Sequence, residues 1–104
     1  MPTREAVVRG LKEVSEEGRE LMRRYMEALA QEKGDTPEGR FEVEFEQVKL
    51  YYDAGQFQDA LESAEGFLEM AQGEQNPEWE ERILTFLGEI DEQIKQGGGS
   101  RMSH

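Results

Sequence analysis

Carboxylates are the only chemically active side chains that this chain offers in number. It has 24 Asp and Glu residues, one His and no Cys. The single histidine, His104, is the last residue, so no Ser–His or Cys–His nucleophile pair can form inside a fold. Without cysteine, thiolate metal sites and disulfides are excluded, which fits a reducing compartment.

The densest group of carboxylates does not have the spacing of a metal or acid–base site. Glu42, Glu44 and Glu46 alternate along the chain, and on a helix alternate residues point about 200° apart. No loop has the Asp, Asn and Gly spacing of a calcium site. Gly97–Gly99 follow a predicted helix instead of opening one, so they do not form a phosphate loop. We expect no metal, no cofactor and no enzymatic activity.

The net charge of −12 is concentrated in the second part of the chain. Residues 1–34 contain seven acidic and seven basic residues, whereas residues 35–96 contain 17 acidic and four basic residues. Phosphates would be repelled, so nucleic acid is a poor partner and a basic protein surface is the natural complement. The alternative is that the glutamates only keep exposed helix faces soluble.

No targeting or membrane segment is predicted. Residues 1–10 carry charges where a signal peptide would have its apolar run. No stretch approaches the roughly 20 apolar residues that a membrane span needs. We expect a soluble, cytoplasmic protein with no membrane partner.

The patterning predicts an all-α fold, with four helices in one domain over residues 1–96. Pro37 and Pro77 each follow a capping residue, Thr36 and Asn76, and open a helix. Residues 97–104, which follow Gln96 and begin with GGGS, are predicted to be a flexible Gly/Ser tail. The expected helices cover about residues 3–33, 37–54, 56–72 and 77–96.

The first predicted helix carries a heptad-like apolar seam. A seam of this kind suits a partner helix or a second copy of the chain, or it packs against the other three helices. Gly18 lies on the seam, where it would permit close approach of another helix. The apolar seam residues proposed as an interface are Val7, Leu11, Val14, Leu21 and Tyr25.

The second segment is ambiguous between strand and helix. Phe41, Val43 and Phe45 alternate with glutamates, as in a half-buried strand. Phe41, Phe45, Val48 and Tyr52 also have the spacing of a helix face. The Thr36–Pro37 start and the lack of a second strand favour the helix.

Residues 51–61, YYDAGQFQDAL, resemble the turn of a tetratricopeptide repeat (TPR). The similarity covers about residues 37–94, as one repeat followed by a capping helix. The family's Trp and Leu-Gly positions fall on Glu44 and on Gln47–Val48, so they are not matched. The two helix starts lie 40 residues apart, where the usual repeat is about 34 residues. The matching residues are Tyr51, Tyr52, Gly55, Phe57, Ala60 and Leu61.

The resemblance implies a protein-binding groove along the helix over residues 37–54. In this register Phe45 and Tyr52 would be aromatic anchors, and Glu42 and Asp53 would select basic residues of a peptide or helix. The alternative is that both aromatic residues are buried under the first helix. The groove residues carried over from the family are Glu42, Phe45, Lys49, Tyr52 and Asp53.

We therefore expect a non-enzymatic protein-interaction module, either an adaptor or a small chaperone, that binds a peptide or helix of a partner. One alternative is an acidic inhibitor that imitates nucleic-acid charge and binds a DNA- or RNA-binding protein. Another is a structural homodimer or a designed helical scaffold without a ligand. The sequence predicts that Tyr51 packs inside the hairpin and that Tyr52 faces a ligand.

Overall fold

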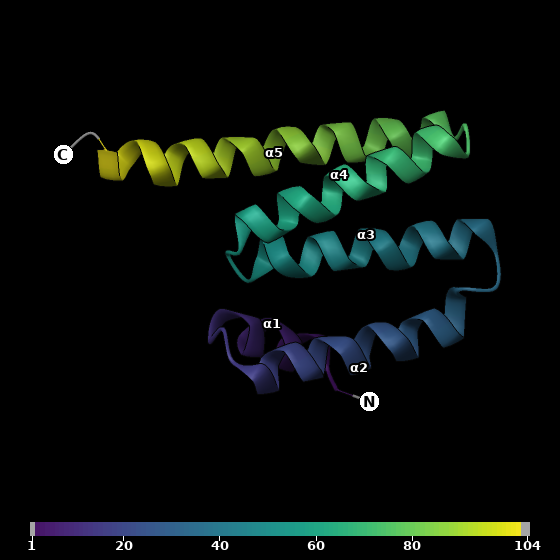
Figure 1. The fold of residues 1–104 in the computed structure, drawn as a ribbon, viewed down its shortest axis with the longest axis horizontal. Coiled ribbons are helices and arrows are strands. Elements are labelled where there is room, and N and C mark those ends of the chain that lie inside the picture. Colours follow the sequence, from purple (N-terminus) through teal and green to yellow (C-terminus); the bar gives the residue numbers. More distant parts are fainter. Residues whose placement is uncertain (1, 103–104) are drawn as a thin grey trace.

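The chain folds into five α-helices joined by short turns, in a computed structural model that describes residues 2–102 (Figure 1). No strand occurs within that range, so the all-α prediction is confirmed and the predicted number of four helices is wrong. The molecule is a flat slab with extents of 49 × 33 × 16 Å. The helices are α1 (Arg4–Lys12), α2 (Glu16–Lys33), α3 (Pro37–Asp53), α4 (Phe57–Gly73) and α5 (Pro77–Met102).

The single long helix predicted at residues 3–33 is in fact a pair of helices. Val14 adopts a left-handed backbone conformation, with φ of 51°, and this reverses the chain. Ser15 then caps α2, because its hydroxyl accepts a hydrogen bond from the Gly18 amide at 3.0 Å. Glu16 and Glu17 add negative charge at the positive end of α2. The cap and the turn therefore outweigh the continuous helical pattern.

The first two helices cross where Gly10 and Gly18 meet. A Cβ atom added to Gly18 would lie 2.1 Å from the carbonyl oxygen of Gly10, so only glycine fits this crossing. The predicted role of Gly18 in a close helix contact is confirmed. The helix that approaches it is α1 of the same chain.

The turn between α3 and α4 agrees with the sequence prediction. Gly55 has φ of 78°, which is a left-handed conformation that glycine adopts without steric cost. Ala60 has no exposed surface and lets α3 and α4 pack closely. The Gln56 side-chain amide donates a hydrogen bond to the Leu11 carbonyl, which ties this turn to the end of α1.

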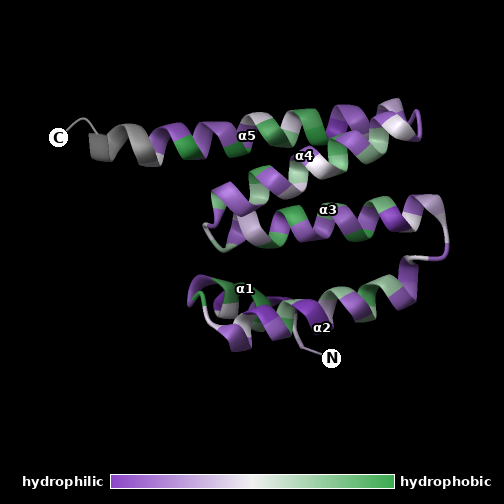
Figure 2. Cartoon of the chain, viewed as in Figure 1, coloured by the Kyte–Doolittle hydropathy of each residue, from purple (hydrophilic) through white to green (hydrophobic). Residues whose placement is uncertain are grey.

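Helix α3 lies between two hydrophobic clusters. On one side Phe41 and Val48 pack with residues of α4 and α5, and on the other side Leu50 and Ala54 pack with α1 and α2. Hydrophobic and hydrophilic residues alternate along this helix (Figure 2). Because residues two apart point in nearly opposite directions on a helix, the strand-like alternation marks a helix with two buried faces. The prediction of a helix here is confirmed.

The last helix packs on α4 and runs further than predicted. Trp79, Ile83 and Ile90 are buried in the cluster shared with α3 and α4. Helix α5 continues to Met102 instead of ending at residue 96, because adding a residue to an existing helix avoids the cost of nucleation. The rest of the predicted tail, Ser103 and His104, lies outside the described residues. None of the described helices is long and apolar enough to cross a membrane.

Candidate functional site

The five predicted groove residues share one face of α3. At about 100° per residue, Glu42, Phe45, Lys49, Tyr52 and Asp53 span roughly 100° of the helix circumference. Glu42 and Asp53 are exposed, and the other three side chains are partly buried. The prediction therefore placed these residues on a common surface, although their surroundings differ from one end of α3 to the other.

The two aromatic residues of this face belong to a network that joins α3, α4 and α5. The Phe45 ring lies 5.7 Å from Phe67, 5.7 Å from Trp79 and 5.6 Å from Phe86, measured between centroids. Tyr52 contacts Phe57 at 5.4 Å and Phe86 at 5.0 Å. Edge-to-face and tilted pairs of this kind stabilise the packing beyond simple burial. Neither ring lies under the N-terminal helices, and each keeps part of its surface exposed.

Both tyrosines pack against other helices, so they do not divide into one packing residue and one ligand-facing residue. Tyr52 packs against aromatic side chains of α4 and α5, whereas Tyr51 contacts both hydrophobic clusters and also lines a groove on the other side of α3. Tyr51 is thus a packing residue, as predicted, with an additional exposed edge. Burial and the nearby carboxylate of Asp59 raise the pKa of the Tyr51 hydroxyl.

The charged residues of the predicted face are paired with other parts of the chain. Lys33 Nζ lies 3.5 Å from Glu42, and Arg4 lies 2.8 Å from Asp53. Lys49 approaches Glu46 at 3.8 Å and lies 5.3 Å from the centre of the Phe45 ring. The acidic edge that Glu42 and Asp53 were expected to form is therefore partly neutralised by basic residues of the N-terminal region.

Helix α5 supplies the exposed carboxylates that the sequence prediction had placed on α3. A groove of about 640 Å³ lies between α3 and α5, and we call it the acidic groove. Glu78 is paired with Arg82, whose guanidinium stacks 4.5 Å from the Trp79 ring. Within the described part of the chain Glu81 and Glu89 have no ion-pair partner. The acidic groove is lined by Phe45, Glu78, Glu81, Arg82, Thr85, Phe86 and Glu89.

The contribution of α5 could have been found from its spacing. Glu78, Arg82, Thr85 and Glu89 follow one another at intervals of four, three and four residues, so they share one face of the helix. The apolar face of this segment packs on α4. The polar face beside Phe86 was not assigned to any site.

The proposed helix seam is not a continuous surface, because the helix that carried it is broken. Val7, Leu11 and Tyr25 are buried between α1, α2 and α3, and Leu21 is partly buried. Val14 lies in the turn and is 65% exposed. The seam mostly forms the second hydrophobic cluster of the fold.

A polar network fastens these N-terminal helices to α3. Glu46 accepts hydrogen bonds from Arg4 Nε at 3.0 Å and from the Tyr25 hydroxyl at 2.7 Å. Burial, followed by the hydrogen bond to Glu46, raises the pKa of Tyr25 to about 12. Both of these hydrogen bonds to Glu46 therefore hold the N-terminal helices against α3. The described residues contain no cluster of three or more His, Cys, Asp or Glu side chains that could hold a metal ion.

Comparisons with protein-family models, with curated proteins and with solved structures find no match.

Proposed function

We propose that this protein is a non-enzymatic interaction module, an adaptor or small chaperone, that binds a peptide or helix of a partner protein. The acidic groove is the binding site. Phe45 and Phe86 contribute an apolar floor, and Glu81 and Glu89 contribute negative charge that no ion pair of the described chain neutralises. This combination of exposed aromatic surface and unpaired carboxylates is the observation that carries the proposal.

The chemistry of this groove favours a ligand with basic and apolar residues together. Aromatic side chains provide a large contact area, and opposite charge speeds the encounter and fixes the orientation of the ligand. Arg82 lines the groove as well, and Lys49 lies over the Phe45 ring, although each already contacts a carboxylate and an aromatic ring. We infer that the ligand places Lys or Arg beside Glu81 and Glu89.

The proposed repeat arrangement is consistent with this site. We infer that α3 and α4 form a TPR-like helix pair and that α5 is the following capping helix. The left-handed Gly55, the buried Ala60 and the packing of α5 on α4 support this inference. In this arrangement α3 and α5 are the equivalent first helices of successive units, and a groove between such helices is where the TPR resemblance predicts a ligand.

Peptide selection tests the proposal. Peptides of random sequence are selected for binding to the immobilised protein, and the recovered peptides are measured by fluorescence anisotropy. We expect peptides that combine Lys or Arg with aromatic or Leu residues. The variant Glu81→Lys/Glu89→Lys should weaken their binding at least tenfold.

A matched control changes the same charge elsewhere. Glu65 and Glu69 are exposed on α4 and do not line the acidic groove, so Glu65→Lys/Glu69→Lys should leave the affinity within about twofold. Selected peptides without basic residues, or equal losses in both variants, would contradict the proposed site.

A further inference from the structure

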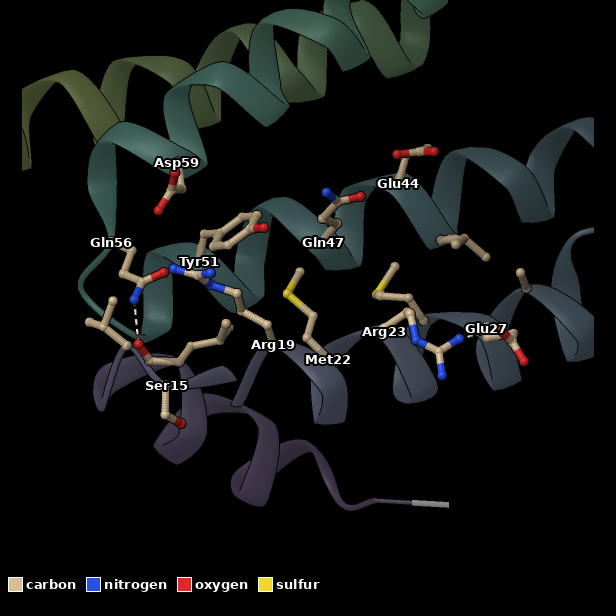
Figure 3. Close-up of a pocket in the computed structure, with 15 residues that line it drawn as sticks. Ser15, Arg19, Met22, Arg23, Glu27, Glu44, Gln47, Tyr51, Gln56 and Asp59 are labelled. Atoms are coloured by element: carbon tan, nitrogen blue, oxygen red, sulfur yellow. Dashed lines mark hydrogen bonds and ion pairs between the residues drawn. The ribbon is translucent and has the colours of Figure 1, made fainter. Parts of the chain in front are cut away.

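A second groove, larger than the acidic groove, lies on the opposite side of α3. Its floor on α3 includes Val43, Glu44, Gln47 and Tyr51, whose mean direction is about 180° from that of the five predicted groove residues at about 100° per residue. Its volume is about 770 Å³. Figure 3 shows its labelled side chains, which come from α2 on one side and from α3 and the start of α4 on the other. We call it the α2/α4 groove. No residue of the acidic groove lines it.

The groove could accommodate one additional helix. Helices α2 and α4 each pack on α3, but within the described residues they do not pack on each other. Both run antiparallel to α3 and lie on either side of it (Figure 1). A helix lying over this face of α3 would pack on it at an ordinary interaxial distance of about 8–10 Å.

The hollow continues along α4. A second, smaller hollow of about 290 Å³ shares Glu44 and Gln47 with the first and adds Ser63, Gly66 and Met70. A Cβ atom added to Gly66 would meet nothing within 4 Å, so the surface of α4 is open here. The backbone of another helix could therefore approach α4 closely at Gly66.

The lining of the groove is apolar along its length and charged at its edges. Met22 and Met26 line it from α2, and Val43 and Tyr51 line it from α3. Met22 and Val43 are buried at its base, whereas Met26 and Tyr51 are partly exposed. Methionine side chains adapt to the shape of an apolar partner. At one end Val14 is 65% exposed in a left-handed conformation, which is unusual for a β-branched residue. An exposed apolar residue in a strained turn adds to the surface that a partner would cover.

Charge complementarity identifies the kind of helix. On the side of α3 and α4, Glu44 and Asp59 are exposed and have no ion-pair partner among the described residues. On the side of α2, Arg23 is already paired with Glu20 and with Glu27, the latter at 2.9 Å. Arg19 also lines the groove from α2 and has no ion-pair partner among the described residues, so that edge carries one unpaired positive charge. The net unpaired charge on the α3 and α4 side is negative. A second copy of this chain, with a net charge of −12, would be repelled by it.

We propose that the α2/α4 groove binds an amphipathic helix of a partner protein, with an apolar stripe on the methionine-lined floor and Lys or Arg residues along the edge that faces Glu44 and Asp59. This site is separate from the acidic groove and does not depend on it.

The test uses two synthetic, hydrocarbon-stapled helices as probes. One carries a leucine stripe with lysines along one edge, and the other has glutamates in place of the lysines. Binding is measured by fluorescence anisotropy. We expect the lysine helix to bind at least tenfold more tightly than the glutamate helix. Equal binding of the two helices, or no binding of either, would overturn the proposal.

Two pairs of variants locate the binding. Gly66→Gln fills the open surface of α4 and should weaken the lysine helix at least tenfold. Gly88→Gln introduces the same side chain at an equally open position of α5 and should have no effect. Glu44→Lys/Asp59→Asn should also weaken binding tenfold, whereas the charge-matched Glu65→Lys/Glu69→Gln should not. Circular dichroism checks that every variant keeps its helix content.

Two further outcomes decide against this site. A tenfold loss caused by Glu81→Lys/Glu89→Lys, with no loss caused by Gly66→Gln, would place the probe in the acidic groove. Light scattering that finds a dimer of the protein alone, dissociated by Gly66→Gln, would show that a second copy occupies the α2/α4 groove.

Discussion

At the scale of single residues, Glu46 joins the N-terminal helices to the rest of the molecule. Its side chain is 13% exposed and bonds to Arg4 of α1 and to Tyr25 of α2. A carboxylate in such a position is stabilised only while its donors remain in place, because an unpaired buried charge is costly. The network therefore contributes to the docking of α1 and α2 on α3.

Tyr25→Phe should remove one donor of this network with little change in shape. We expect the free energy of unfolding at pH 7 to fall by about 1.5 kcal/mol, the lower end for a hydrogen bond to a charged group. Urea denaturation of the two proteins measures the difference. An unchanged free energy would show that the bond does not contribute to stability.

The same residue gives a pH dependence with a defined sign. The pKa of Tyr25 is raised from 10.0 to about 12 in the fold, so the folded state favours the neutral phenol. Its contribution is complete below pH 10 and is lost as pH rises through about 12. In urea titrations from pH 9 to pH 12 the free energy of unfolding should therefore fall more steeply for the wild type than for Tyr25→Phe. Parallel curves would contradict this assignment.

At the scale of elements, the N-terminal hairpin depends on two local features that oppose a single long helix. One is the Ser15 cap with the reversed backbone at Val14, and the other is the contact between Gly10 and Gly18. A substitution at either feature should change the free energy of unfolding in a defined direction.

Gly18→Ala should disrupt the crossing of α1 and α2. The new Cβ atom would lie 2.1 Å from the Gly10 carbonyl oxygen, so we expect a loss of about 2 kcal/mol, as for overpacking in a core. Gly66→Ala is the matched control, since its Cβ atom meets open space and alanine favours the helix by about 0.5–1 kcal/mol. Denaturation curves should shift in opposite directions. A shift in the same direction would contradict the close helix contact.

Val14→Asn tests the reversal of the chain. Asparagine tolerates the left-handed conformation better than valine, and the side chain is 65% exposed, so little burial is lost. We expect the free energy of unfolding to rise by about 1 kcal/mol, measured by urea denaturation. A decrease would indicate that Val14 is stabilised by contacts that outweigh its backbone strain.

The sequence predicted those elements whose signals are local. Thr36 and Asn76 are capping residues in the structure, Gly55 has positive φ, and Ala60 is buried at the hairpin. The break at Val14–Ser15 was missed because the apolar heptad spacing continues through it. The signal was present in Ser15 followed by Glu16 and Glu17, which is a typical helix start.

At the scale of the whole molecule, the position of a helix between its neighbours decides which charges remain unpaired. The sequence correctly placed Glu42, Phe45 and Asp53 on one face of α3, because helical spacing alone determines that. It could not show that Lys33 and Arg4, from other helices, would pair with the two carboxylates. It also could not show that the polar face of α5 would lie beside Phe45. Contacts between distant segments depend on packing, which spacing does not encode.

The distribution of charge also separates the two ends of the slab. Residues 1–34 are neutral overall and contribute Arg4 and Lys33 to ion pairs with α3, whereas the acidic excess lies in residues 35–96. Binding of a basic peptide at the acidic groove should therefore weaken as salt is raised, because the carboxylates involved are exposed and are screened over about 10 Å at 0.1 M ionic strength. Affinities at 0.05 M and 0.5 M salt measure this, and an affinity independent of salt would contradict a role for Glu81 and Glu89.

The most direct test of the central claim is a nuclear magnetic resonance titration. The ¹⁵N-labelled protein is titrated with a basic, aromatic-containing peptide recovered by selection, and the amide shifts are mapped on the chain. Binding in the acidic groove predicts that the largest changes cluster at Phe45, Thr85, Phe86 and Glu89. Changes centred on Met22, Gln47 and Gly66, or spread evenly over the acidic residues, would contradict it.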